Sequence, residues 1–313
     1  MSSSGAASRA AGLPRPENQA AVVALTVIAL TGFAANSLLC RMALRGGAID
    51  PASFTAVRLV SGALVLNFLL LLRGGYRSGG DWKSGVVLFI YAAAFSIAYV
   101  SIPAGAGALL LFGSVQTTMI VRGLVQGEHP RWYEWCGLAL ACAGLIALIS
   151  PGLSAPPLGS GLIMMAAGIA WGVYSLRGRS SRDAVAGSAG NFLRALPFAL
   201  PFLLWVQLRP GQAGAPGLHF DTAGLVEAIL SGALASGLGY AVWYTVLPAL
   251  TAMRAAVVQL AVPVLVAVAG VAFLGEQVSL RLIGCGALTL GGVALATCYP
   301  LYLKLYRKPQ QRH

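Results

Sequence analysis

Ten polar or aromatic residues stand inside long apolar runs of this sequence, where their side chains could bind a small polar molecule. Hydroxyl, amide and indole groups make hydrogen bonds, and aromatic rings offer flat apolar faces. An unpaired polar group in hydrocarbon costs several kcal/mol, so such groups should face a cavity or one another. The candidates for binding a substrate are Asn36, Tyr91, Tyr99, Gln116, Thr117, Trp171, Tyr174, Tyr240, Trp243 and Gln259.

The polar candidates differ in how strongly their surroundings favour a binding role. Gln116 and Thr117 stand beside Thr118 in the most polar cluster within any apolar run, and three such neighbours cannot all face lipid. Gln259 is alone in its run as an uncharged group with hydrogen-bonding reach. Asn36 has the alternative role of bridging two helices.

The aromatic candidates also have a plain packing alternative. Trp171 and Tyr174 are three residues apart and share a helix face, as do Tyr240 and Trp243. Aromatic stripes at this spacing also occur in packed cores and in interfacial belts. Tyr240 is the deeper of its pair and is favoured. Tyr99 has a counterpart in the second half of the chain, so one member of that pair could be purely structural.

Two arginines lie several residues inside apolar runs. Arg58 and Arg194 could bind a substrate carboxylate. Their matching positions in the two halves of the chain instead favour side chains that reach the interface or hold helix ends together. Glu128 and Glu276 each follow a glycine at a run end and are interpreted as caps or loop anchors.

Acidic residues are missing from the middle of the apolar runs, and the three histidines lie in loops or at the chain end. An intramembrane enzyme needs paired carboxylates, a His–Asp pair or a metal cluster at membrane depth, so an enzyme is not expected. A lipophilic cation would find no buried counter-charge, which favours a neutral or zwitterionic solute. The five cysteines lack zinc-ligand spacing and are interpreted as small hydrophobic residues. Neither a metal nor a cofactor is predicted.

The composition indicates a membrane environment. Hydrophobic residues make up 58% of the chain and charged residues 10%, which is too apolar for a surface covered by water. The net charge of +12 would suit nucleic-acid binding, but the basic residues form short clusters between long uncharged runs. A lipid bilayer is the expected partner, and nucleic acid is not.

Ten apolar runs predict an all-α membrane protein with ten transmembrane helices. The first run is too long for the core of a cleaved signal peptide, and Pro103 separates the third from the fourth in a tight hairpin. Residues 1–19 are predicted to be a disordered cytoplasmic tail, and residues 304–313 a basic cytoplasmic tail. The runs span residues 20–40, 52–72, 84–102, 104–122, 135–150, 159–176, 187–206, 226–247, 252–274 and 281–303.

Basic residues predict the orientation. Ten spans place both chain ends on one side of the membrane. With both ends in the cytoplasm, fifteen lysines and arginines lie in cytoplasmic segments and four in outside segments. Cytoplasmic segments of membrane proteins carry such an excess, so both termini are expected in the cytoplasm.

The second half of the chain repeats the first. The segment 98–104 matches 243–249, Gly127-Glu128 matches Gly275-Glu276, residues 33–38 match 171–176, and Arg58 matches Arg194. Each half has five spans, an odd number, so the second copy enters the membrane from the opposite side. Residues 20–150 and 151–303 are therefore predicted to be inverted repeats, a design that places the substrate near the midplane.

Each half contains the same ordered features: Phe33-Ala or Trp171-Gly in its first span, a Tyr-x-x-x-Pro-Ala segment, and a Gly-Glu followed by a glycine-rich span. This order resembles the EamA-type repeat of the drug/metabolite transporter superfamily. The resemblance covers about residues 20–303 and is clearest over 240–292, although Ser114 or Val115 stands where the second half has Pro263. It implies a ten-span inner-membrane carrier of amino acids, nucleotide precursors or other metabolites, often an exporter.

The residues and the resemblance together predict a secondary transporter of the bacterial inner membrane that works by alternating access. Its substrate is expected to be a small zwitterionic or neutral metabolite, with export of amino acids as the first choice. The alternative is a carrier of drugs, nucleosides or other metabolites, and a channel or an intramembrane enzyme is disfavoured. Small residues on the fifth and tenth spans are compatible with a monomer or a homodimer.

Overall fold

The computed structural model of the chain describes residues 19–73, 79–125, 132–150, 155–178, 183–208, 217–250, 255 and 258–306. Over these residues the chain forms helices, with an isolated β-bridge between Ile49 and Phe220. The helices are α1 (Gln19–Arg45), α2 (Pro51–Leu72), α3 (Trp82–Tyr99), α4 (Ala104–Val125), α5 (Trp132–Ile149), α6 (Leu158–Gly178), α7 (Ala184–Leu208), α8 (Thr222–Leu230), the π-helix η1 (Ser231–Leu238), α9 (Gly239–Val246), the 3₁₀-helix η2 (Leu247–Ala249), α11 (Ala261–Leu274) and α12 (Leu280–Tyr306).

The predicted all-α membrane fold is confirmed. Seven helices of the described part are long and apolar enough to cross a bilayer, and three shorter apolar helices accompany them at 135–149, 261–274 and 280–295. The predicted break at Pro103 is the turn between α3 and α4. The exact number of spans and the inverted orientation of the two halves stay predictions.

The predicted tails lie mostly outside the described residues. Helix α1 begins at Gln19, so residues 1–18 of the predicted N-terminal tail are not described. Helix α12 continues to Tyr306, three residues into the predicted C-terminal tail, and residues 307–313 are not described. In the ninth apolar run, residues 252–254 and 256–257 are likewise outside the description.

Four aspartates cap the N-termini of four helices. Asp50 accepts hydrogen bonds from the first backbone N–H groups of α2, and Asp183 does the same for α7. Asp81 and Asp221 cap α3 and α8 in the same way. Helix N-termini carry unsatisfied N–H donors and a partial positive charge, which a carboxylate stabilises. The second and third helices of both halves therefore use their aspartates at helix ends, away from the middle of the bundle.

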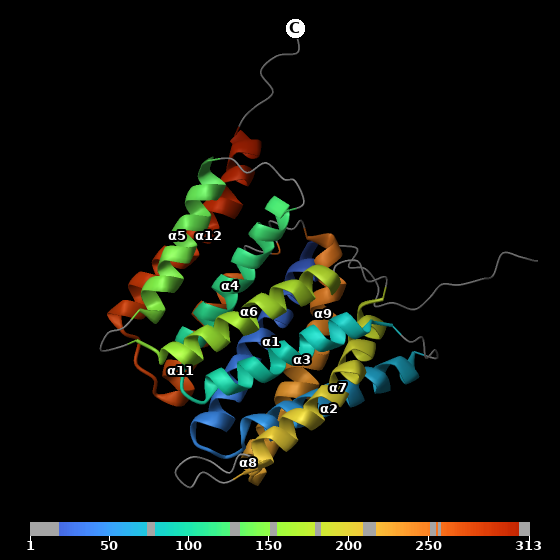
Figure 1. Cartoon of the computed structure of the whole chain (residues 1–313). Helices are drawn as coiled ribbons and strands as arrows, with labels where there is room; N and C mark the ends of the chain where they lie inside the picture. The colour runs from blue at the N-terminus through green and yellow to red at the C-terminus, as the bar shows by residue number, and fades with distance from the viewer. Residues whose placement is uncertain are drawn as a thin grey trace, which may run out of the picture.

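The main contacts between the two halves come in equivalent pairs: where a helix of the first half packs on a helix of the second, the corresponding helices with the halves exchanged also pack together. Helix α3 of the first half packs on α6 of the second, and α1 of the first half packs on α8, η1 and α9 of the second. Likewise α4 packs on α6, and α11 packs on α1. The helices α2 and α7 contact each other, and α5 and α12 run side by side at one edge of the molecule (Figure 1).

Small residues let the π-helix η1 approach α2 closely. A Cβ added at Gly232 would overlap Ser61 Oγ and the carbonyl oxygen of Arg58. This agrees with the close helix packing that small residues permit in membranes. The i→i+5 turns of a π-helix are rare and often mark functional sites. The segment around η1 thus joins the second half to the middle of α2.

One end of the bundle, here called the Glu276 end, is closed by an ion pair between the two halves. Arg41 Nε on α1 lies 3.1 Å from Glu276 Oε1, between α11 and α12. Glu276 Oε2 also accepts a hydrogen bond of 2.7 Å from Ala104 N at the start of α4. Gly275 ends α11 with a φ of 62°, a left-handed conformation suited to glycine. Glu276 is thus the loop anchor expected from the sequence, although the helix it caps is α4.

The opposite end, here called the Asp81 end, has a second ion pair between the halves. Arg177 Nη2 at the end of α6 lies 2.8 Å from Asp81 Oδ1 at the start of α3. Arg177 Nε also donates to Ser84 Oγ at 2.9 Å. Asp81 N donates to Asn191 Oδ1 on α7 at 3.0 Å. This pair is more exposed than the pair at the Glu276 end, with side-chain exposures of 38% and 49% against 14% and 13%.

Candidate binding site between the two halves

A buried arginine lies at the centre of the polar groups in the bundle. Arg58 on α2 is 1% exposed. Its Nε donates to Ser236 Oγ at 3.0 Å, and its Nη2 donates to the hydroxyls of Tyr91 at 3.1 Å and Tyr240 at 3.0 Å. Its guanidinium carbon lies 5.0 Å from the ring centroid of Tyr91 and 5.1 Å from that of Phe95, within cation–π range.

Asn36 connects α1 to the same groups. Its Nδ2 donates to the Tyr91 hydroxyl at 3.2 Å, and its Oδ1 accepts from Ser231 Oγ at 2.7 Å and from Ser236 Oγ at 3.3 Å. In an α-helix two residues five apart point about 140° away from each other. The wider π-helical turn of η1 brings both serines to one amide oxygen. We call these six residues, Asn36, Arg58, Tyr91, Ser231, Ser236 and Tyr240, the Arg58 network.

An aromatic cluster covers one side of the Arg58 network. Trp171 on α6 is at its centre, with ring centroids 4.6 Å from Tyr240, 5.0 Å from Tyr91 and 5.7 Å from Phe33. Trp243 also packs on Phe33, with ring centroids 5.6 Å apart. Such edge and tilted arrangements are the favoured geometries of aromatic pairs. Phe33 and Trp171, which the repeat places at matching positions, are thus in direct contact between the halves.

Six of the ten candidates come together in this region. Asn36, Tyr91 and Tyr240 belong to the Arg58 network, Trp171 packs on it, and Tyr174 and Trp243 adjoin the aromatic cluster. All six side chains are buried. These six residues come from α1, α3, α6 and α9. The sequence placed them in four separate runs, and the structure brings them to one location.

The other four candidates lie elsewhere. Tyr99 packs at the turn between α3 and α4, where its hydroxyl donates to Ala104 O at 3.4 Å. Gln116 is fully buried in α4, and Thr117 next to it is half-buried. Gln259 Nε2 donates to Ala255 O, one turn earlier in the chain, at 3.0 Å. Among the hydrogen bonds of the described residues, none links these four side chains to the Arg58 network.

Of the two structural roles expected for Arg58, reaching the interface was wrong. Its side chain is enclosed by α1, α3 and the η1–α9 segment, so it cannot extend to water. Ser231 and Ser236 were not recognised as site residues. The available signal was an arginine inside an apolar run with no acidic residue in the neighbouring runs. The matching position of Arg194 in the second half instead favoured a structural role for Arg58.

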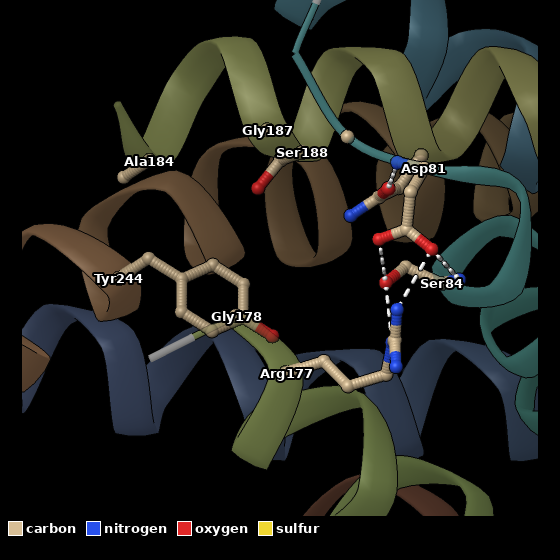
Figure 2. A pocket seen from close by; sticks show the side chains of 10 residues that line it. Asp81, Ser84, Arg177, Gly178, Ala184, Gly187, Ser188 and Tyr244 are labelled. Carbon is tan, nitrogen blue, oxygen red and sulfur yellow. Dashed lines mark hydrogen bonds and ion pairs between the residues drawn. The ribbon is translucent and has the colours of Figure 1, made fainter. Parts of the chain in front are cut away.

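A pocket of about 210 Å³ opens at the Asp81 end. The hydroxyl groups of Ser188 and Tyr244 lie across it from the Asp81–Arg177 pair (Figure 2). Partial burial raises the pKa of Asp81, but hydrogen bonds from Ser84 and Arg177 outweigh it and hold that pKa below its ordinary value. Asp81 is therefore charged at neutral pH and keeps its bond to Arg177.

A column of aromatic rings leads from this pocket to the Arg58 network. Tyr244 lines the pocket, and its ring centroid is 6.0 Å from that of Tyr174. Tyr174 lies 5.6 Å from Trp171, and Trp171 lies 4.6 Å from Tyr240. Tyr240 in turn contacts Arg58. These ring contacts connect the Asp81 end to the buried arginine.

Sequence comparison assigns the chain to a family. Residues 20–150 and 159–298 each match the EamA-like transporter family. The chain belongs to this family. The uncharacterized protein PA1977 of Pseudomonas aeruginosa is 54% identical over 273 residues, which is 87% of this chain and 92% of that protein. A solved crystal structure superimposes with a TM-score of 0.65 at 21% identity and covers 92% of this chain and 99% of its own. That likeness concerns the fold.

The family assignment defines a membrane transporter and confirms the two-copy resemblance seen in the sequence. The two matched segments lie on either side of residues 151–158. Membership makes membrane transport the general activity of this EamA-like protein. Its uncharacterized relative gives no substrate, so the substrate must be argued from the site.

Proposed function

We propose that this EamA-like protein is a secondary transporter that exports small zwitterionic or neutral metabolites, amino acids first, across the bacterial inner membrane by alternating access. The observation that carries this proposal is the Arg58 network together with its aromatic cover. It lies between α1–α3 of the first half and η1–α9 of the second, inside an otherwise apolar bundle. A polar site shared by two repeats is the arrangement expected of a carrier.

The ion pairs at the two ends support alternating access. Arg41–Glu276 and Asp81–Arg177 each join the first half to the second, and they lie at opposite ends of the bundle. Breaking one pair while the other persists would open the site to one side at a time. The more exposed pair beside the pocket makes the Asp81 end the easier one to open.

The exchanged helix contacts support the inverted relation of the two halves. Tyr99 and Tyr244 stand at matching repeat positions, yet Tyr99 packs at the Glu276 end and Tyr244 lines the pocket at the Asp81 end. Matching residues at opposite ends are expected if the second half is inverted. With both termini in the cytoplasm, as the basic residues favour, the Asp81 end faces the cytoplasm and the Glu276 end faces outward.

A site of this chemistry suits an amino acid better than a lipophilic cation. The hydroxyl and amide groups of the Arg58 network provide hydrogen bonds, while the rings of Trp171 and Phe33 provide apolar faces. An ammonium group can rest over such rings. A cation without a carboxylate would instead meet the charge of Arg58. Drugs, nucleosides and other metabolites form the second class to be tried.

The test is uptake of labelled amino acids into liposomes that contain only the purified protein, first without and then with a pH gradient. The proposal predicts saturable uptake that is stimulated when unlabelled substrate is loaded inside, because a carrier exchanges substrate faster than it returns empty. Liposomes without protein give the background. Uptake that neither saturates nor responds to internal substrate would instead indicate a channel. If no amino acid is taken up, the proposal of amino-acid transport is refuted, and drugs, nucleosides and other metabolites are tested next.

A further inference from the structure

Arg58 is a buried cation without a carboxylate partner in the described part of the chain. The ion pairs found there are Arg41–Glu276 and Arg177–Asp81, both at the ends of the bundle. The aspartates of the described residues are occupied as helix caps. Burying a charge is costly unless it is paired. Three hydrogen bonds and two aromatic faces reduce this cost at Arg58 and leave its positive charge unneutralised.

The hydrogen bonds of Arg58 leave part of its binding capacity unused. A guanidinium group has five N–H donors and no acceptor. Nε uses its donor on Ser236, and Nη2 uses its two donors on Tyr91 and Tyr240. Nη1 is buried and has no hydrogen-bond partner among the described residues. Both N–H donors of Nη1 are therefore available to an acceptor.

The groups around Arg58 add to this excess of donors. The Tyr91 hydroxyl receives contacts from Arg58, Asn36 and Tyr240, although a hydroxyl oxygen has two lone pairs to offer. The amide oxygen of Asn36 is already shared by Ser231 and Ser236. A buried, positively charged group of donors with few acceptors is complementary to an anion that brings acceptors of its own.

We propose that Arg58 is the anion-binding centre of this transporter and that its Nη1 group binds the carboxylate of the substrate. This inference rests on the proposed transport function and narrows its substrates to zwitterions that carry one carboxylate, amino acids above all. A charged hydrogen bond to a carboxylate is stronger than a neutral one. The carboxylate also supplies the counter-charge that the protein lacks at this point. Arg58 thereby separates carboxylates from the corresponding amides and amines.

The charge of the site favours a carboxylate over a phosphate. Arg58 offers a single positive charge, and no other lysine or arginine joins the Arg58 network among the described residues. A phosphate monoester carries between one and two negative charges at neutral pH and three strong acceptor oxygens. One guanidinium group cannot neutralise that charge and donate to all three oxygens. The body of the ligand would lie against Phe95, Trp171 and Phe33, so small apolar or aromatic side chains fit it best.

A purely structural role is the competing explanation. Arg58 connects α2 to α3 and to the η1–α9 segment, so its loss would loosen the bundle with or without a ligand. Stability alone cannot separate the two roles. The separating property is chemical selectivity, since only a binding role makes carboxylate preference depend on Arg58.

The first experiment measures thermal unfolding of the purified full-length protein with a panel of probes at millimolar concentration. The panel contains the amino acids and simple monocarboxylates, each with its primary amide, and phenyl phosphate. We expect at least one carboxylate to raise the unfolding midpoint and its amide to have a much smaller effect. Equal stabilisation by acid and amide, preference for phenyl phosphate, or no stabilisation by any carboxylate would overturn the inference.

The second experiment repeats the measurement with variants. In Arg58→Gln the affinity for the best carboxylate should fall about tenfold or more, as expected for a lost charged hydrogen bond, while affinity for its amide changes little. Arg58→Lys keeps the positive charge, and Tyr240→Phe nearly keeps the side-chain volume. These two variants replace Arg58→Gln if that variant does not fold, and each should reduce the ratio of acid to amide affinity in part. Arg194→Gln is the matched control and should keep the wild-type ratio of acid to amide affinity. An unchanged ratio in all Arg58 and Tyr240 variants would contradict the inference.

Transport of the same probes separates this inference from the proposed function. Carboxylates that bind through Arg58 but are not moved into liposomes would refute transport of these compounds and leave the anion site standing. Amides moved as well as acids would establish transport and refute the anion site.

Discussion

Arg58 and Arg194 stand at matching positions of the two repeats, yet the structure uses them differently. Arg58 is enclosed and bonds to side chains of the other half, Ser236 and Tyr240. Arg194 is half-buried, and its Nη1 donates to the backbone carbonyls of Gly79 at 2.8 Å and Gly190 at 2.9 Å. The first arginine is placed to meet a ligand, and the second braces the segment before α3 against α7.

The difference follows from what surrounds each arginine. Gly79 presses against α7 so closely that a Cβ on Gly190 would overlap its carbonyl oxygen, and this contact brings backbone acceptors to Arg194. Around Arg58 the neighbours are hydroxyl groups of Tyr91 and Tyr240, which accept hydrogen bonds from its guanidinium and belong to side chains and not to the backbone. Repetition of the fold therefore does not repeat the site.

The largest effect is expected from removing the two arginine side chains in turn. Arg58→Gln should lower kcat/KM for carboxylate counterflow about tenfold to a hundredfold, because it removes the charge that pairs with the substrate. Arg194→Gln should lower it only a few-fold through a looser Asp81 end. Initial rates in proteoliposomes, normalised to inserted protein, measure both. Equal losses in the two variants would erase the functional distinction between the repeats.

The next effect concerns Asn36. Asn36→Ala leaves the hydroxyls of Ser231 and Ser236 without their acceptor, so the free energy of unfolding should fall by about 1–3 kcal/mol, and flux should fall with it. Gln259→Ala is the comparison, because the Gln259 amide bonds to the chain one turn earlier and not to the Arg58 network. A larger loss of flux in Gln259→Ala than in Asn36→Ala would mean that the binding site lies near the start of α11 and not at the Arg58 network.

The two ion pairs should differ in strength. Glu276→Gln removes the charged partner of the largely buried Arg41 and weakens the cap of α4, so it should destabilise the protein by about 1–3 kcal/mol. Asp81→Asn breaks a pair that is more than a third exposed, and its effect should stay below about 1 kcal/mol. Thermal unfolding in one detergent at one pH compares the two variants. The reverse order would mean that the Asp81 end is the tighter closure.

The smallest effect is the pH dependence of the Asp81 pair. Because the pKa of Asp81 is held below its ordinary value in the folded protein, its contribution to stability is complete above that ordinary value. The contribution is lost as the pH falls through the lower pKa of the folded state. The difference in unfolding midpoint between wild type and Asp81→Asn should therefore shrink on acidification. A difference that grows toward acidic pH would have the wrong sign.

Much of the fold could be predicted because membranes impose simple rules. Most of the apolar runs became helices close to the expected bounds, and Pro103 lies in the turn between α3 and α4 as expected. The choice of Asn36, Tyr91, Trp171 and Tyr240 also led to one location, because polar and aromatic groups inside apolar runs must find each other. These inferences needed only composition and spacing.

The rest of the site depends on which helices meet. The burial of Arg58 results from the packing of α2 against α3 and η1, which local sequence does not contain. Ser231 and Ser236 reach the same amide because η1 is a π-helix, a hydrogen-bond pattern that helical periodicity does not predict. Tyr99 and Gln259 satisfied the same spacing rules but lie apart from the Arg58 network.

The central claim is that the Arg58 network is reached from each side of the membrane in turn. It is tested by placing a cysteine at Ser236 in a functional variant without the five native cysteines, and labelling it with a membrane-impermeant, negatively charged thiol reagent from either side. The account predicts labelling from both sides, slowed by a transported carboxylate, and faster labelling from the Asp81 side in Asp81→Asn. Labelling from neither side, or from one side at a rate that substrate does not change, would contradict it.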